Sequence, residues 1–151
     1  MLKDQTSEFH ALHVKRAKDS LLEQGDFYHE ITFAKDGHEQ ALVIIPRGPT
    51  RATQAAAQAI ADSDEADMIS GAIMAWIESV SRHEDYKLGD VGRSPTRTEL
   101  LMVVTADREG NRFTSVSEVL REAGKVRLEE RRVELPPGMI VPELKPPSVR
   151  S

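Results

Sequence analysis

Hydrophobic and polar positions follow a helical period at the start of the chain. Residues 6–24 place apolar side chains on one helical face, at Phe9, Leu12, Ala17 and Leu21. Thr6 or Ser7 can cap the start of this segment, and Gly25 lies just past its end. The pattern predicts a helix over 6–24.

The period then changes to two, which is typical of a β-hairpin. Phe27, Ile31 and Phe33 alternate with polar residues, so this strand is expected to have one apolar and one solvent-facing side. Asp36-Gly37 predicts the turn, because a type I′ turn needs positive φ at both central positions. The return strand, 40–45, is apolar on both sides, which predicts a place inside the sheet beside Glu99–Thr105.

Four later segments have clear local signals. The alanine-rich segment 50–61 predicts a second helix, since alanine has the highest helix propensity. Residues 99–105 are expected to form a buried strand, followed by a loop at 107–111 in which Gly110 or Asn111 can take the left-handed conformation. Residues 125–135 alternate as a charged edge strand, with Val126 and Leu128 facing inward.

Two segments fit either a helix or a strand. Residues 66–80 show apolar faces at both periods, and periodicity alone does not separate a buried strand from a buried helix. At 115–124, Ser115 and Glu118 form a capping box with Gly124 as a stop, which favours a helix. A tight return from the preceding strand favours a second strand there instead.

The C-terminal tail, 136–151, holds five of the eight prolines and has no regular period. We expect it to be extended and polyproline-like. The length of 151 residues fits one domain, over 1–135, followed by this tail.

Composition restricts the classes of chemistry and partner. The chain has no cysteine, which excludes disulfides and thiolate sites and fits a reducing cytoplasm. The first residues lack the features of a signal peptide, and no apolar run reaches the roughly 20 residues of a membrane span. The net charge of −5 argues against nucleic acid as a partner.

Three groups of residues in the second half resemble a loose class of short uncharacterised bacterial and phage proteins. They are Ala66-Asp67 leading to Met74-Ala75-Trp76, then Ser94-Pro95-Thr96-Arg97-Thr98-Glu99, and then Asp107-Arg108-Glu109-Gly110. The resemblance covers about residues 66–130 and implies no activity. It implies strands in both ambiguous segments.

The expected fold class is therefore α+β. It has a largely antiparallel sheet of four to six strands, with two helices packed on one face. The order is helix-strand-strand-helix-strand-strand-strand, followed by the proline-rich tail.

The histidines are candidates for chemistry, but each has a simpler interpretation. His10 and His13 are three residues apart and close enough to share a metal, yet surface or half-buried helix histidines explain them better. His29 lies on the apolar side of its strand, where a hydrogen-bonded core histidine is expected. His83 is followed by two carboxylates, the combination that a general base needs.

The sequence predicts no catalytic residue, metal ligand or cofactor. A possible pocket or interaction surface is formed by Trp76, His83, Arg93, Arg97 and Glu99, in which Arg97 and Glu99 can pair. The expected function is a non-enzymatic accessory or interaction protein that binds a protein partner or a second copy of itself. The alternatives are a small-molecule binding module and a small hydrolase that uses His29 or His83 with nearby carboxylates.

Overall fold

The computed structural model describes residues 2–26, 29–36, 38–45, 66–77, 98–133, 135 and 140–144, together with residues 55, 58, 59 and 62. For residues 40–45, 76 and 77 it describes the backbone alone. The elements are α1 (Lys3–Gln24), β1 (His29–Lys35), β2 (His38–Ile45), β3 (Met68–Ile77), β4 (Thr98–Asp107), β5 (Arg112–Glu122) and β6 (Lys125–Arg131).

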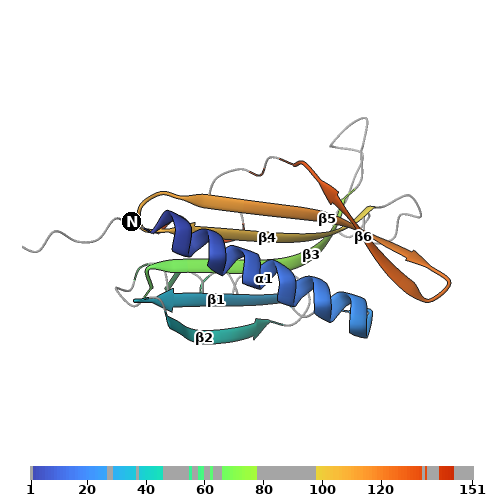
Figure 1. Cartoon of the computed structure of the whole chain (residues 1–151), viewed down its shortest axis with the longest axis horizontal. Coiled ribbons are helices and arrows are strands. Elements are labelled where there is room, and N and C mark those ends of the chain that lie inside the picture. Colours follow the sequence, from blue (N-terminus) through green and yellow to red (C-terminus); the bar gives the residue numbers. More distant parts are fainter. Residues whose placement is uncertain are drawn as a thin grey trace, which may run out of the picture.

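The six strands form one antiparallel sheet in the order β2-β1-β3-β4-β5-β6. The sheet curves as a half-barrel, and α1 lies across one of its faces (Figure 1). The prediction of two helices packed on one face was wrong, because α1 is the one helix of the described residues that packs on the sheet. Most of the predicted second helix, 50–61, lies outside the described residues, and its described residues 55, 58 and 59 are helical and exposed. The antiparallel sheet itself is confirmed.

Helix α1 begins at Lys3, one turn earlier than predicted. Thr6 therefore lies inside the helix, and its hydroxyl donates to Asp107 of β4 at 2.7 Å instead of capping the helix. Ser7 is likewise inside the helix. At the other end, the prediction for Gly25 is confirmed: it adopts φ 74° and its N–H donates to the Leu21 carbonyl at 2.9 Å.

The first hairpin has the predicted turn but a different place in the sheet. β1 and β2 are joined at Asp36, which has φ 51°. Among the described strands β2 pairs with β1 alone and lies at the sheet edge, so the predicted pairing of 40–45 with 99–105 was wrong. Of the two strands of this hairpin, β1 is the one that lies inside the sheet. Its polar side is covered by α1, and Thr32 on that side is fully buried.

Both ambiguous segments are strands, as the resemblance implies. β3 pairs along its whole length with β4, from Met68–Asp107 to Ile77–Thr98. At 115–124 the helix interpretation fails because Gly124 belongs to a two-residue turn that joins β5 to β6. Ala123 and Gly124 have φ 51° and 77°, the positive values that such a turn requires. Gly110, with φ 85°, serves the preceding hairpin as predicted.

Each face of the sheet has its own apolar core. Beneath α1, Ala17 and Leu21 pack against four buried sheet residues: Ala72, Leu101, Val103 and Val119. The opposite face is covered by part of the C-terminal tail, where Val141 and Leu144 are buried against β1, β3 and β4.

A glycine allows the tail to approach the sheet closely. A Cβ atom on Gly71 of β3 would lie 2.9 Å from both Ile140 Cγ2 and Val141 Cγ1. Such contacts are shorter than real Cβ atoms show, so a side chain here would displace the tail.

We predict that Gly71→Ala lowers the free energy of unfolding by about 1–3 kcal/mol, measured by urea denaturation, because it overpacks this contact. Val141→Ala is the matched partner. If the contact is the cause, the cost of Gly71→Ala falls in the Val141→Ala background, and strictly additive costs would contradict the explanation.

Candidate functional site

The buried side of α1 is polar along its first half. Thr6, His10 and His13 are buried and point toward the sheet, with 0%, 8% and 0% of their surfaces exposed. Beneath them lie Ser70 of β3 and Thr105 of β4, which are opposite one another in the sheet and fully buried. The helix and the sheet thus meet here through side chains that need hydrogen bonds.

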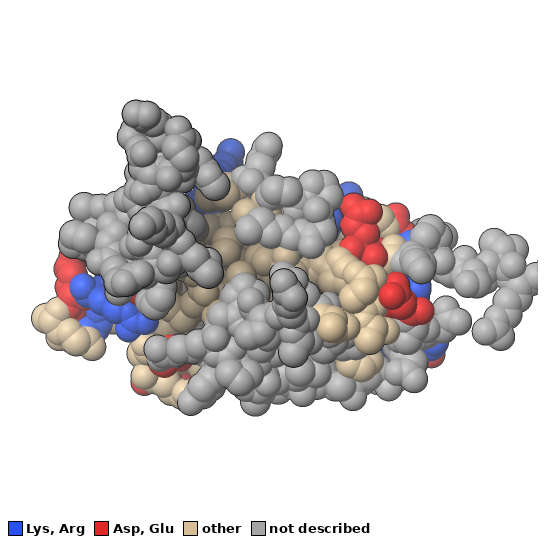
Figure 2. All heavy atoms as spheres, turned by 180° about the vertical axis from the view of Figure 1, so that it is seen from behind, with Lys and Arg blue, Asp and Glu red and all other residues tan. Residues whose placement is uncertain are grey.

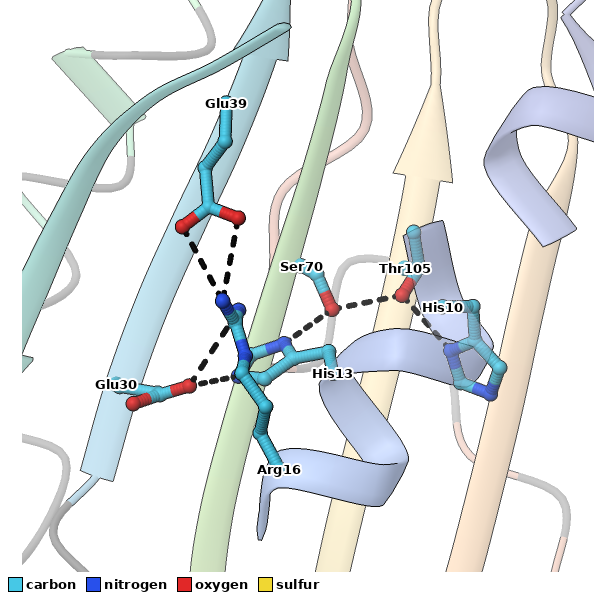
Figure 3. Close-up of polar contacts among 7 residues, drawn as sticks. All are labelled: His10, His13, Arg16, Glu30, Glu39, Ser70 and Thr105. Atoms are coloured by element: carbon cyan, nitrogen blue, oxygen red, sulfur yellow. Dashed lines mark hydrogen bonds and ion pairs between the residues drawn. The ribbon is translucent and has the colours of Figure 1, made fainter. Parts of the chain in front are cut away.

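These residues form a continuous series of hydrogen bonds. His10 Nε2 lies 2.8 Å from the Ser115 hydroxyl of β5, and His10 Nδ1 lies 2.8 Å from the Thr105 hydroxyl. The Thr105 and Ser70 hydroxyls are 2.7 Å apart. The His10 side chain therefore connects β5 to β4. Figure 3 shows the contact of His10 with Thr105 and the hydroxyl pair that extends the series to β3.

The series continues through His13 to the sheet side of β1. His13 Nδ1 lies 2.6 Å from the Ser70 hydroxyl, and His13 Nε2 lies 2.6 Å from Glu30 Oε1. Figure 3 shows the imidazole held between the two. Arg16 reaches Glu30 at 3.8 Å and Glu39 of β2 at 3.2 Å, so the series ends in an exposed ion pair. Such exposed pairs contribute little to stability.

The protonation of His10 follows from its surroundings. Burial, with a smaller effect from the nearby His13, lowers the pKa of His10 to about 4. Its imidazole is therefore neutral at neutral pH, with one donor and one acceptor nitrogen.

With His10 neutral, each hydroxyl of the series can donate to one neighbour and accept from the other. His13 Nε2 carries a proton, because two lone pairs would repel at 2.6 Å from the Glu30 carboxylate. When His13 Nδ1 is the acceptor, it accepts from Ser70, Ser70 accepts from Thr105, and Thr105 accepts from His10 Nδ1–H.

Glu30, His13 and Ser70 have the composition of a carboxylate–imidazole–hydroxyl triad, but the geometry does not suit nucleophilic catalysis. The Ser70 hydroxyl is fully buried and shared with Thr105. His13 is part of α1, the element that covers Ser70, so any movement of α1 that exposed Ser70 would also remove its base. We therefore assign these groups to the attachment of α1.

A second buried carboxylate fixes the start of α1. Asp107 accepts the Thr6 hydroxyl at 2.7 Å, the backbone N–H groups of Glu109 and Asn111 at 2.8 and 3.0 Å, and the Asn111 side chain at 2.9 Å. A carboxylate with this many donors is satisfied without a counter-ion. It ties the first turns of α1 to the β4–β5 hairpin.

Two of the five predicted pocket residues, Trp76 and Glu99, lie among the described residues. Glu99 accepts two hydrogen bonds from Arg121 of β5, at 2.9 and 3.0 Å, and Arg121 also donates to the Gly25 carbonyl at 2.7 Å. The backbone of Trp76 lies opposite Glu99 in the sheet. His83, Arg93 and Arg97 lie outside the described residues, so their convergence with Trp76 and the Arg97–Glu99 pair stay predictions.

The prediction for the two helix histidines was wrong: both are buried. The available signal was their helical spacing with Ala17 and Leu21: Thr6, His10, His13, Ala17 and Leu21 follow one another at four, three, four and four residues and so share one face. His29 is buried as expected, and its Nε2 accepts the backbone N–H of Met74 at 3.0 Å. Leu12, expected on the buried face, is 61% exposed.

Within the described ranges, no three histidine or acidic side chains are grouped to hold a metal ion. No protein-family model, curated protein or solved structure matches the chain.

The lowered pKa of His10 predicts how stability depends on pH. The unfolded chain, with a pKa near 6.5, binds a proton more tightly than the folded protein. The free energy of unfolding is therefore highest above pH 6.5 and falls as the pH drops toward about 4. His10→Gln keeps a donor and an acceptor but does not titrate, so urea denaturation across this range should show a flatter decline. His38→Gln, at an exposed position, controls for the loss of a histidine, and equal slopes in all three proteins would contradict the assignment.

Two buried threonines on the same side of the sheet should respond oppositely to valine. Thr105 is in the middle of the hydrogen-bond series, whereas the Thr32 hydroxyl is buried without a hydrogen-bond partner among the described residues. Thr32→Val should raise the free energy of unfolding by about 1 kcal/mol, because it removes an unsatisfied hydroxyl at nearly constant shape.

Thr105→Val should lower it by about 1–3 kcal/mol, since His10 and Ser70 each lose a partner. Thermal or urea unfolding of the two variants checks this. A loss of stability in Thr32→Val as large as that in Thr105→Val would contradict the network as described.

Proposed function

We propose that this protein is a non-enzymatic accessory protein that binds a protein partner by strand addition at the β6 edge. The observation that carries the proposal is the exposed outer edge of β6. The strand pairs with β5 on one side, and no described strand pairs with its other side. Unpaired backbone donors and acceptors on an edge strand are a template for another strand.

The β6 edge is held in a strand conformation before any partner binds. Val126 and Leu128 pack against the core beneath α1. Lys18 of α1 reaches Glu130 at 3.7 Å, and Arg131 forms a short ion pair with Glu118 of β5. A preformed edge lowers the ordering cost of strand addition.

Charged side chains of both signs surround this edge. Arg127 and Glu130 are 66% and 88% exposed. In the view from behind, Lys and Arg side chains gather at the end of the molecule that carries the β5–β6 hairpin, on the left of Figure 2. Charges of both signs beside open backbone groups can select a partner of complementary pattern.

The other reactive groups support a non-enzymatic role. The described histidines with a buried imidazole, His10, His13 and His29, are hydrogen-bonded inside the protein.

No helix in the described part of the chain is long and apolar enough to span a membrane. The cysteine-free composition and the resemblance to bacterial and phage proteins support the cytoplasm as the compartment, and the net charge of −5 supports a protein rather than a nucleic acid as partner.

Strand addition predicts that one outward N–H of β6 is essential. The closing pair of the two-residue β5–β6 turn, Glu122–Lys125, is hydrogen-bonded, so the N–H groups of residues 126, 128 and 130 point away from β5. Glu130→Pro removes one of them while leaving the ladder to β5 intact. Glu130→Ala keeps the N–H and serves as the matched control.

We expect peptides selected from a displayed library of extended sequences on the wild-type protein to bind Glu130→Ala and to lose most of their affinity for Glu130→Pro, measured by interferometry. Unfolding midpoints check that both variants fold. Selected binders that hold Glu130→Pro as tightly as the wild type would place the binding surface elsewhere.

A further inference from the structure

The outward backbone groups of β6 define which antiparallel registers a second strand can take. Residues 126, 128 and 130 direct both N–H and C=O away from β5, as derived above from the β5–β6 turn. In an antiparallel pair, a residue whose N–H and C=O point toward the second strand must lie opposite a residue whose N–H and C=O point back toward it. A second β6 strand satisfies this when the two-fold axis passes beside Leu128, because Val126 then lies opposite Glu130 and Leu128 opposite its own copy.

The side chains of β6 are self-complementary in this register. Arg127 of each copy lies opposite Glu129 of the other, in the non-hydrogen-bonded positions where the Cα atoms approach to about 4.5 Å. The two Leu128 side chains meet at the centre. Lys125 lies opposite Arg131, whose charge is already balanced by Glu118 and Glu129.

Neighbouring registers lack this match. An axis beside Arg127 places that residue opposite its own copy. An axis beside Glu129 places two glutamates opposite one another and also sets Arg127 opposite Arg131. Proteins usually protect an edge strand against pairing with charged side chains, most often lysine, or with proline. The charges of β6 are of opposite sign and stand at equal distances on either side of an apolar residue, so in this register they attract a second copy.

We propose that the partner at the β6 edge is a second copy of this chain, paired antiparallel about Leu128. This inference rests on the proposed function and names its partner. The pairing joins two six-stranded sheets edge to edge through about six backbone hydrogen bonds. An interface of one strand on each side is small, so the dimer is weak and depends on concentration.

Charge exchange across the two-fold axis tests the register. The whole chain is examined by sedimentation equilibrium from about 10 µM to about 1 mM, with each variant's unfolding midpoint measured in dilute solution. Arg127→Glu creates two Glu–Glu contacts in the dimer and should weaken association by about tenfold, and Glu129→Arg should do the same with two arginine pairs. The double variant Arg127→Glu/Glu129→Arg restores both opposite-charge pairs and should recover association to within about threefold of the wild type.

The outcomes separate this inference from the proposed function. A wild-type protein that stays monomeric at about 1 mM, or a dimer that neither the single reversals nor Glu130→Pro weaken, overturns the inference. Displayed peptides that still require the Glu130 N–H would then leave strand addition by another protein standing. Two results together support both the inference and the proposed function: Glu130→Pro dissociates the dimer, and the double variant Arg127→Glu/Glu129→Arg recovers the association that each single reversal weakens.

Discussion

The arrangement of this protein depends on one buried histidine. His13 connects Ser70 on β3 to Glu30 on β1, with 2.6 Å contacts on both sides and no exposed surface. A buried carboxylate or hydroxyl without a partner is costly, so each of these groups specifies the position of the other two. The apolar core farther along α1 stabilises the packing of the helix, but hydrophobic contacts are not directional. The hydrogen bonds of His10 and His13 therefore determine where along the sheet the helix lies.

This constraint also explains the order of the strands. The polar side of β1 suits a solvent-facing position by itself, but here it faces the polar side of α1. β1 can therefore lie inside the sheet, with Glu30 in contact with His13 of the helix and Thr32 buried on the same side, while β2 takes the edge. Matched polar faces allow an amphipathic strand to lie inside the sheet, which a rule based on hydrophobic alternation alone does not anticipate.

The two faces of the sheet are closed by different means. On one side α1 is attached by directional hydrogen bonds and a short apolar core. On the other, Val141 enters the space that the absent Cβ of Gly71 leaves open. With both faces covered, the open backbone groups of the described sheet lie on the outer edges of β2 and β6, and the charge pattern of β6 is the basis of the proposed partner.

Local pattern by itself determined the hairpin at Asp36-Gly37, the helix ending at Gly25, the left-handed Gly110, the buried strand at 99–105 and the charged edge strand from Lys125. These depend on turn geometry and on neighbours close in the chain. The tertiary structure decided which strand of the first hairpin lies inside the sheet, that 115–122 is a strand, and that His10 and His13 are buried. Each of those outcomes depends on a partner many residues away in the sequence, such as Glu30 for His13 or Thr105 for His10. Helical or strand spacing does not predict which polar side chain a residue contacts in the folded protein, because that contact is set by the tertiary structure.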